Sequence, residues 1–465
     1  MSNGLKRGMF IVLCANLINM IFNLLTNFML PKYLTVEVYS AIKTYQLYTS
    51  YVGIVHLGFI DGMYIKYGGS EMENINLKKL GTNLATFRMF QFIETVFFFI
   101  IAIILKDMIF LMFTLSILPM NMATYFKYLY QATGEFKIYG KVLNLTTIIT
   151  FFVNSILVFL IKSDKELVYL ISYVIINIFI WIILEIMIEK KCSYKFGLLW
   201  ISFKEGVTSI KNGVYLMLGT FSSTLLTSMD RWFVKFFMNT IEFAQYSFAV
   251  SVESFLNIAV TPITVTLYNY FCKNHKVERI QFMKRCVMIF AVFIVSVAYL
   301  AKFVLEIFLN NYLQSIKVIF ILFASQIIYI VLKGVYVNIY KARKQQKRYF
   351  CELITIVFLG FTLNFILYFL MGNMESFAWA TLISALVWFI VCCIDFKDIP
   401  CSWQEISYLF FEIALFIIIG IKFSSLIGFL IYIVVSFFFT IIFMKSTVRE
   451  IMLKFIKKLS KNNKR

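Results

Sequence analysis

Apolar residues run along the whole chain in stretches of about 20, separated by short polar or basic segments. A helix of that length crosses the roughly 30 Å of hydrocarbon in a bilayer. The stretches lack the alternation of apolar and polar positions that strands show, so they predict helices. Fourteen membrane spans are expected, at 9–30, 40–64, 84–105, 109–130, 141–161, 167–188, 212–230, 243–270, 286–308, 316–339, 350–371, 376–394, 405–422 and 425–444.

The pattern repeats itself at a spacing of 210 residues. Residues 130–160 and 340–370 align without a gap, and 11 of the 31 aligned positions are identical. Composition explains shared Leu, Ile and Phe. It does not explain Tyr130 matched with Tyr340, or Asn154 matched with Asn364. We therefore expect two like-oriented halves, as in transporters whose site lies between internal repeats.

The predicted fold is an all-α integral membrane protein with about 14 transmembrane helices in two six-helix lobes and a C-terminal hairpin. Between the lobes, a stretch with an apolar face resembles a helix lying on the cytoplasmic leaflet, and the tail has the same character. The expected parts are an N-terminal lobe at 1–190, an amphipathic linker at 191–211, a C-terminal lobe at 212–395, a hairpin at 396–445 and a basic amphipathic tail at 446–465.

Composition supports the membrane class and argues against an enzyme. Hydrophobic residues make up 61% of the chain and charged residues 15%, whereas soluble domains are nearer half and a quarter. The eight cysteines show no metal-binding spacing, and two histidines are too few for a histidine metal site. No glycine-rich phosphate loop is present. We expect no cofactor, no metal and no catalytic residue.

Lysine and arginine gather in alternate loops. By the positive-inside rule these loops are cytoplasmic, and with an even number of spans both termini are cytoplasmic too. Lys344 is therefore expected inside and Asp164 outside. The net charge of +20 reflects this excess facing anionic membrane lipids, so it calls for no nucleic acid.

Charged residues inside spans are costly and are candidates for function. Five cations come from spans 2, 4 and 10 and from span 7 or its exit. These spans would line an interface between two halves, and a cavity walled by these cations would bind an anion. These candidates are Arg231, Lys43, Lys235, Lys127 and Lys333. Asp230 and Glu253 are the candidate ion-coupling residues, for H⁺ or Na⁺. Snorkelling and salt bridges between helices remain an open alternative for this set.

Other intramembrane charges have simpler interpretations. Glu185 and Glu352 lie near predicted cytoplasmic ends, where they snorkel or cap a helix. Lys302 and Glu306 are four residues apart on one helix face and are expected to pair. Glu412, in the hairpin, is expected to be structural.

Four motifs, in this order and spacing, resemble those of a known family. They are residues 27–39 (NFMLPKYLTVEVY), 57–62 (LGFIDG), 130–137 (YQATGEFK) and 229–233 (MDRWF) with 245–249 (QYSFA). The chain resembles the Wzx-type flippases of the polysaccharide transporter branch of the MOP exporter superfamily, which also contains the MATE multidrug exporters. The resemblance covers residues 1–395 well and the last hairpin more loosely.

This resemblance implies a flippase that moves undecaprenyl-pyrophosphate-linked oligosaccharide repeat units to the outer leaflet of the cytoplasmic membrane. The products would be O-antigen, capsule or exopolysaccharide, and a polysaccharide polymerase and a chain-length regulator would be partners. The pyrophosphate would enter a cationic cavity between the lobes, and the prenyl chain would stay in lipid or in a lateral groove. Alternating access would be driven by an ion gradient or the membrane potential.

Three alternatives remain open. A MATE-type drug or cation antiporter would need an acidic cavity, often with a carboxylate in span 1, and span 1 has none. A polymerase or membrane glycosyltransferase would need a large external loop, whereas the longest predicted one has only about ten residues. A structural membrane protein would not need intramembrane charges from several spans.

Overall fold

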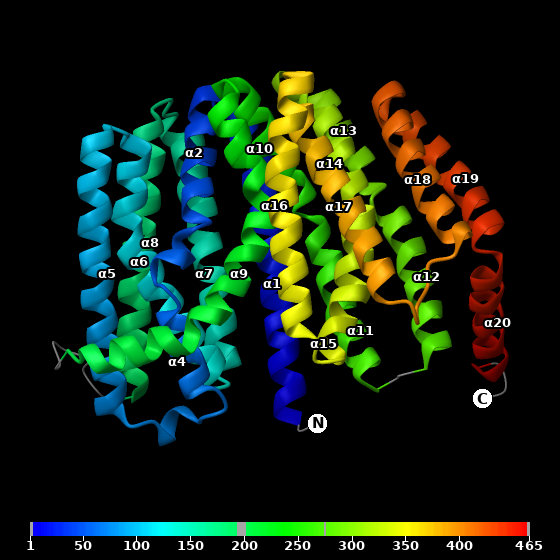
Figure 1. Cartoon of the computed structure of the whole chain (residues 1–465). Coiled ribbons are helices and arrows are strands. Elements are labelled where there is room, and N and C mark those ends of the chain that lie inside the picture. The colour runs from blue at the N-terminus through cyan, green and yellow to red at the C-terminus, as the bar shows by residue number, and fades with distance from the viewer. Residues whose placement is uncertain (1–2, 193–200, 274–275, 463–465) are drawn as a thin grey trace. The chain divides into compact units, whose positions relative to one another are not determined.

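The computed structural model describes residues 3–192, 201–273 and 276–462 (Figure 1). These residues form helices and connecting loops without any strand, which confirms the all-α class. Ten helices are long and apolar enough to cross a membrane, and the chain is a multi-pass membrane protein. Many large apolar side chains face outward, such as Ile104 at 72% exposure, as a lipid-facing surface requires.

The described chain forms two compact units, residues 1–228 and 229–465. The helices of the first unit are α1 (Asn3–Tyr33), α2 (Val36–Thr49), α3 (Val52–Val55), α4 (Phe59–Tyr67), α5 (Leu77–Leu105), α6 (Met108–Ala132), α7 (Phe136–Ser155), α8 (Glu166–Cys192) and most of α9 (Phe203–Phe237). A π-helical turn, η2 (Ile156–Ile161), extends α7, and a short 3₁₀ turn, η1 (Met72–Asn74), precedes α5.

The second unit begins within α9. Its further helices are α10 (Thr240–Glu253), α11 (Leu256–Lys273), α12 (Val277–Ile294), α13 (Val297–Phe308), α14 (Ser315–Val331), α15 (Val337–Ala342), α16 (Gln346–Met371), α17 (Glu375–Asp395), α18 (Trp403–Lys422), α19 (Ser425–Phe443) and α20 (Lys445–Asn462). The π-helical turn η4 (Leu332–Tyr336) joins α14 to α15, and the 3₁₀ turn η3 (Asn310–Tyr312) precedes α14. Helices α18 and α19 lie side by side as a hairpin (Figure 1).

The ten spanning helices correspond to predicted spans 3–6 and 9–14. The boundary between spans 3 and 4 rests on two residues. Lys106 ends α5 in the left-handed conformation (φ 54°), and the Asp107 side chain caps α6 by accepting from two backbone N–H groups at 2.9 and 3.0 Å. Span 1 lies within α1, which continues through Pro31 to Tyr33. The total of fourteen spans stays a prediction.

Spans 2 and 8 are broken helices rather than single ones. The first changes direction at Ser50–Tyr51 and again at Leu57–Gly58, whose φ angles of 47° and 85° are left-handed. The second breaks at Ser254–Phe255, between α10 and α11. Both breaks follow a capped helix of 14 residues, so the two units share this irregularity.

The internal repeat is visible in the backbone. Helices α6 and α15 end at Ala132 and Ala342, and α7 and α16 begin at Phe136 and Gln346, in both cases 210 residues apart. Each turn is closed by an N–H donated to the carbonyl of a buried tyrosine, Tyr130 at 2.9 Å and Tyr340 at 2.8 Å. The two turns therefore match, although residues 133–136 differ from residues 343–346 at every position.

The predicted amphipathic segments are described in part. Trp200 lies outside the described residues, but the linker's last nine residues form the start of α9, where Phe203 is 84% exposed. In the tail, α20 exposes Ile451 and Met452. That these two segments lie on a membrane surface stays a prediction.

Candidate functional site

Four of the predicted site residues lie together in the second unit: Asp230, Arg231, Glu253 and Lys333. Asp230 on α9 is buried, and its Oδ2 accepts a hydrogen bond from the Tyr246 hydroxyl of α10 at 2.6 Å. Its Oδ1 accepts from the backbone N–H of Arg231 at 2.8 Å. Two hydrogen bonds hold this buried carboxylate in one orientation.

Glu253 ends α10 and is the second carboxylate of this charged cluster. Its Oε1 accepts from the side-chain amide of Gln326 on α14. It interacts electrostatically with Asp230, Arg231 and Lys333. Two carboxylates and two cations therefore share one polar region, which we call the Asp230–Glu253 cluster.

Two cations of this cluster, Arg231 and Lys333, have N–H groups that a ligand could use. The buried Nε of Arg231 has no acceptor in the part of the chain that the structure describes, an unusual state for a buried donor. Lys333 lies in η4 and places its ammonium 5.4 Å from the centre of the Tyr329 ring. π-Helical turns inside long helices often occur at functional sites.

The other predicted cations have different surroundings. Lys43, on α2 in the first unit, donates to Asn27 Oδ1 at 2.9 Å and Gln46 Oε1 at 3.1 Å, and it is only 5% exposed. Lys235, at the end of α9, lies 5.1 Å from the centre of the Phe243 ring. Lys127, on α6, has no hydrogen bond or ion pair among the described residues.

The structure therefore brings together Asp230, Arg231, Glu253 and Lys333, and it places Lys43 and Lys127 in the first unit. A single cavity shared by all five cations stays a prediction.

The remaining intramembrane charges have partners. Glu185 pairs with Arg88 of α5, and Glu352 accepts from the Tyr340 hydroxyl at 2.6 Å. Lys302 lies 3.7 Å from Glu306, as predicted, and it also donates to the carbonyl of Gly420 at 2.8 Å. Glu412, which is expected to be structural, accepts from Ser436 at 2.7 Å.

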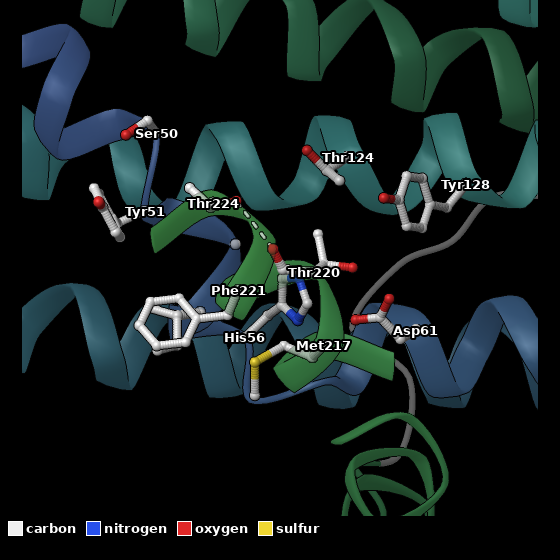
Figure 2. A pocket seen from close by; sticks show the side chains of 12 residues that line it. Ser50, Tyr51, His56, Asp61, Thr124, Tyr128, Met217, Thr220, Phe221 and Thr224 are labelled. Atoms are coloured by element: carbon white, nitrogen blue, oxygen red, sulfur yellow. Dashed lines mark hydrogen bonds between the residues drawn. The ribbon is translucent and has the colours of Figure 1, made fainter. Parts of the chain in front are cut away.

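Sequence reasoning missed a polar cavity in the first unit (Figure 2). Its volume is about 120 Å³, and its lining includes His56 and Asp61, which are 5% and 6% exposed. Hydroxyl groups of α6 and α9 complete the walls. Asp61 stood in a recognised motif, but nothing in the sequence indicated that α9, more than 150 residues later, packs against it.

The second unit also contains an apolar groove of about 610 Å³. Residues of α14, α17 and α18 line it, among them Ile328, Phe389 and Phe410. Lys397, Pro400 and Cys401 of the loop 396–402 also line it. Arg343 donates to both carboxylate oxygens of Asp398 in this loop and lowers the pKa of that carboxyl below its ordinary value.

No family model and no curated protein matches this chain. Solved structures do match it. The lipid II flippase MurJ in an inward closed conformation is 13% identical, with 94% of this chain and 100% of that chain covered and a TM-score of 0.68. This likeness shows that the fold of that flippase extends over nearly the whole chain.

Two MATE transporters match more distantly. A point mutant of the Vibrio cholerae MATE transporter VcmN is 14% identical, with 85% of this chain and 96% of that chain covered and a TM-score of 0.49. An outward-facing multidrug resistance MATE transporter of the MOP superfamily is 13% identical, with 87% and 96% covered and a TM-score of 0.42.

Proposed function

We propose that this chain is a transporter of the MOP superfamily, and within it a flippase for undecaprenyl-pyrophosphate-linked oligosaccharide repeat units. The observation that carries the proposal is the fold, which matches the full length of a lipid II flippase. The resemblance of four motifs to the polysaccharide transporter branch favours a sugar repeat unit as cargo. The chain would work by alternating access in the cytoplasmic membrane, with both termini cytoplasmic, and not as an enzyme.

The Asp230–Glu253 cluster supports an anionic headgroup as part of the cargo. A pyrophosphate that leaves water needs fixed donors, because an unpaired charge in the bilayer is expensive. Arg231 has a spare buried N–H and a planar fork that fits phosphate oxygens. Lys333 lies in the same cluster, and Lys43, Lys127 and Lys235 are further candidate contacts for pyrophosphate or sugar.

The apolar groove supports a lipid tail as the other part of the cargo. Its walls are mostly aliphatic and aromatic, and Lys397 of the loop 396–402 also lines it. A prenyl chain in this groove would bury apolar surface while its phosphate end stayed near a cation. The groove is thus the lateral path for the prenyl chain.

Asp230 and Glu253 are the proposed coupling residues. Binding of H⁺ or Na⁺ would change the net charge of the Asp230–Glu253 cluster, and with it the hold of Arg231 and Lys333 on an anion. A carboxylate that alternately binds a cation and pairs with an arginine gives the linkage that coupled transport requires. A polysaccharide polymerase and a chain-length regulator remain the proposed partners.

The central experiment follows the lipid-linked intermediate. A strain lacking this protein should accumulate undecaprenyl-pyrophosphate oligosaccharide on the cytoplasmic face. In proteoliposomes, Arg231→Ala should slow flipping by about ten- to a hundredfold, the loss of a charge-assisted partner worth about 1.5–3 kcal/mol. Arg231→Lys should be tolerated in part, because lysine lacks the bidentate geometry. Lys422→Ala, at the exposed end of α18, is the matched control.

One observation favours a second candidate, a MATE-type ion-coupled antiporter for drugs or cations. Asp61 is a buried carboxylate in a polar cavity, which is the chemistry a cationic cargo requires. Joint neutralisation of Lys43, Arg231 and Lys235 separates the two functions. Unchanged flipping of the repeat unit would exclude the anion site and favour the antiporter.

A further inference from the structure

The polar cavity of the first unit has the composition of a binding site that the proposed function does not use. It is formed by the broken helix at residues 50–61, by α6 and by the first half of α9, and Figure 2 shows the side chains that line it. Its volume of about 120 Å³ is several times the 10–15 Å³ that one water needs. It is too small for an oligosaccharide, so its ligand is an ion or a very small molecule.

Asp61 supplies a negative charge that has no counterpart. The residue is 6% exposed, and within the described ranges its carboxylate accepts no hydrogen bond from another residue and forms no ion pair. Figure 2 shows the carboxylate at the cavity wall. A buried carboxylate without a partner is costly to maintain, unless a ligand balances the charge.

His56 is neutral on the evidence of its hydrogen bond. The backbone N–H of Gly58 donates to His56 Nδ1 at 3.2 Å, so Nδ1 is the acceptor and the ring proton is on Nε2. The histidine is 5% exposed and brings no positive charge to Asp61. The cavity therefore keeps a net negative charge of one.

Four serine and threonine hydroxyl groups of the cavity present lone pairs rather than protons. Thr124, Thr220 and Thr224 each donate their single hydroxyl hydrogen to the backbone carbonyl four residues earlier, at 2.8, 3.2 and 3.1 Å. Ser50 donates to a carbonyl three residues earlier, at 2.6 Å. A hydroxyl whose hydrogen is committed this way can only accept from, or coordinate, whatever occupies the cavity.

We propose that this cavity binds a hard monovalent cation of the Na⁺ class, with Asp61 as the charged ligand and hydroxyl oxygens of α6 and α9 completing the shell. Oxygen-only acceptors suit hard cations, whereas transition metals prefer nitrogen and sulfur. One carboxylate balances one charge, and a divalent ion would leave a positive charge buried. The site lies in the first unit, whereas Asp230 and Glu253 lie in the second.

Two helices that form the walls of the site, α4 and α9, are tightly packed against each other. Helices α4 and α9 touch backbone to backbone beside it, because a Cβ added to Gly62 would overlap Ser209 O, and one added to Gly213 would overlap Gly58 O. Such close packing fixes the Asp61 backbone relative to Thr220 and Thr224. A rigid frame of oxygen atoms is what a selective cation site requires.

The test is equilibrium binding of ²²Na⁺ to the purified full-length protein in detergent, with choline chloride keeping the ionic strength constant. Saturable binding is expected from the wild type. Asp61→Asn keeps the shape and removes the charge, so the affinity should fall by about tenfold or more. Thr224→Val removes one oxygen ligand and should weaken binding several-fold. Glu412→Gln is the matched control, since that buried carboxylate already accepts from Ser436 at 2.7 Å.

The outcomes do not depend on whether the chain flips lipids. Binding should survive Asp230→Asn, because that residue belongs to the other unit. The proposal is overturned if folded wild-type protein shows no saturable Na⁺ binding, or if Asp61→Asn and Thr224→Val both leave it unchanged. Should Asp61→Asn not fold, as judged by size-exclusion chromatography, Thr224→Val decides alone. Displacement by Mg²⁺ at lower concentration than by unlabelled Na⁺ would contradict the monovalent assignment.

Discussion

Lys284 and Glu405 are the most completely buried ion pair in the described chain. Their side chains are 0% and 2% exposed, and Nζ lies 2.8 Å from Oε2. Arg285 adds a second bond to the same carboxylate at 2.6 Å. The arrangement ties the start of α18 to α12. The loss of stability on removing one charged group depends largely on whether its partner is buried.

We expect Glu405→Gln to lower the free energy of unfolding by about 3–5 kcal/mol, because it leaves Lys284 buried without a counter-charge. Glu205→Gln is the matched control. Its pair with Lys66 is equally short, 2.8 Å, but the side chains are 36% and 33% exposed. Its loss should stay below about 1 kcal/mol. Reversible unfolding in mixed micelles measures both, and equal losses would contradict the burial argument.

Asp230→Asn tests the coupling role. The amide keeps the shape and removes the charge, so export of the repeat unit should fall by at least about tenfold, the size of one lost charge-assisted bond. Tyr246→Phe removes the hydrogen bond at 2.6 Å but leaves the charge, and should impair export much less. Membrane protein level is measured alongside. Normal export by both Asp230→Asn and Glu253→Gln would end the coupling proposal, and a parallel loss of protein would indicate a structural salt bridge.

At the residue scale, sequence reasoning found charges but not their neighbours. Asp230, Arg231, Glu253 and Lys333 were named from their predicted depth alone, and three helical segments, α9, α10 and η4, bring them together. The partner of Lys43, Asn27, lies 16 residues away, on another helix. Polar partners of this kind depend on helix packing, which hydrophobic pattern does not encode at the level of single residues.

At the scale of helices, the contact of α4 with α9 depends on residues without side chains. Gly62 and Gly213 lie where the two backbones meet, and a methyl group at either would overlap a backbone atom of the other helix. Close approach through small residues is the usual way for membrane helices to pack tightly. Gly219, farther along α9, faces open space.

We expect Gly62→Ala to separate α4 from α9 and to lower thermal stability measurably, since overpacking costs about 1–3 kcal/mol. Gly219→Ala should be neutral or slightly stabilising, because alanine favours helix and nothing obstructs its methyl group. Fluorescence-detected unfolding of the two variants provides the comparison. An unchanged Gly62→Ala melting temperature would mean that this contact is loose.

The sequence predicted that the spans are helices and where most of them begin and end, but it did not predict where a helix is interrupted. The apolar runs gave ten spanning helices, most of them within about four residues, but the helices at Leu77–Leu105 and Val277–Phe308 begin earlier than the predicted residues 84 and 286. Spans 2 and 8 are interrupted at Ser50–Tyr51 and Ser254–Phe255, and neither interruption carries a proline. Hydropathy indicates that a segment is buried in lipid or in protein. A buried segment does not have to be one continuous helix.

At the scale of the whole molecule, the loops follow the repeat. Because basic loops alternate with neutral ones, Lys344 should be cytoplasmic and Asp164 external. An impermeant thiol reagent, applied to single-cysteine variants at the two positions in a background without native cysteines, measures this. Labelling from outside is expected at position 164 only. The reverse pattern would invert the topology.

The duplication was the most reliable global prediction. Tyr130 and Tyr340, which are 210 positions apart, each accept the backbone N–H that closes one of two matching turns. Two related halves follow from the sequence because a repeat copies packing along with residues. The division at residues 228 and 229, inside α9, could not be read from composition, since no polar linker marks it.

The ion pair between α12 and α18 also bears on biosynthesis. Arg285 and Glu405 are 120 residues apart, and Lys302 donates to Gly420, another late partner. At a synthesis rate of about 5–20 residues per second, the 120 residues between Arg285 and Glu405 take about 6–24 s to be made. The carboxylate that neutralises the cations of α12 is therefore absent for that time. During that interval the nascent chain carries uncompensated lysine and arginine at the translocon. The last hairpin therefore completes the insertion of helices made long before it, and a chain that stops before residue 405 should be a substrate for membrane quality control.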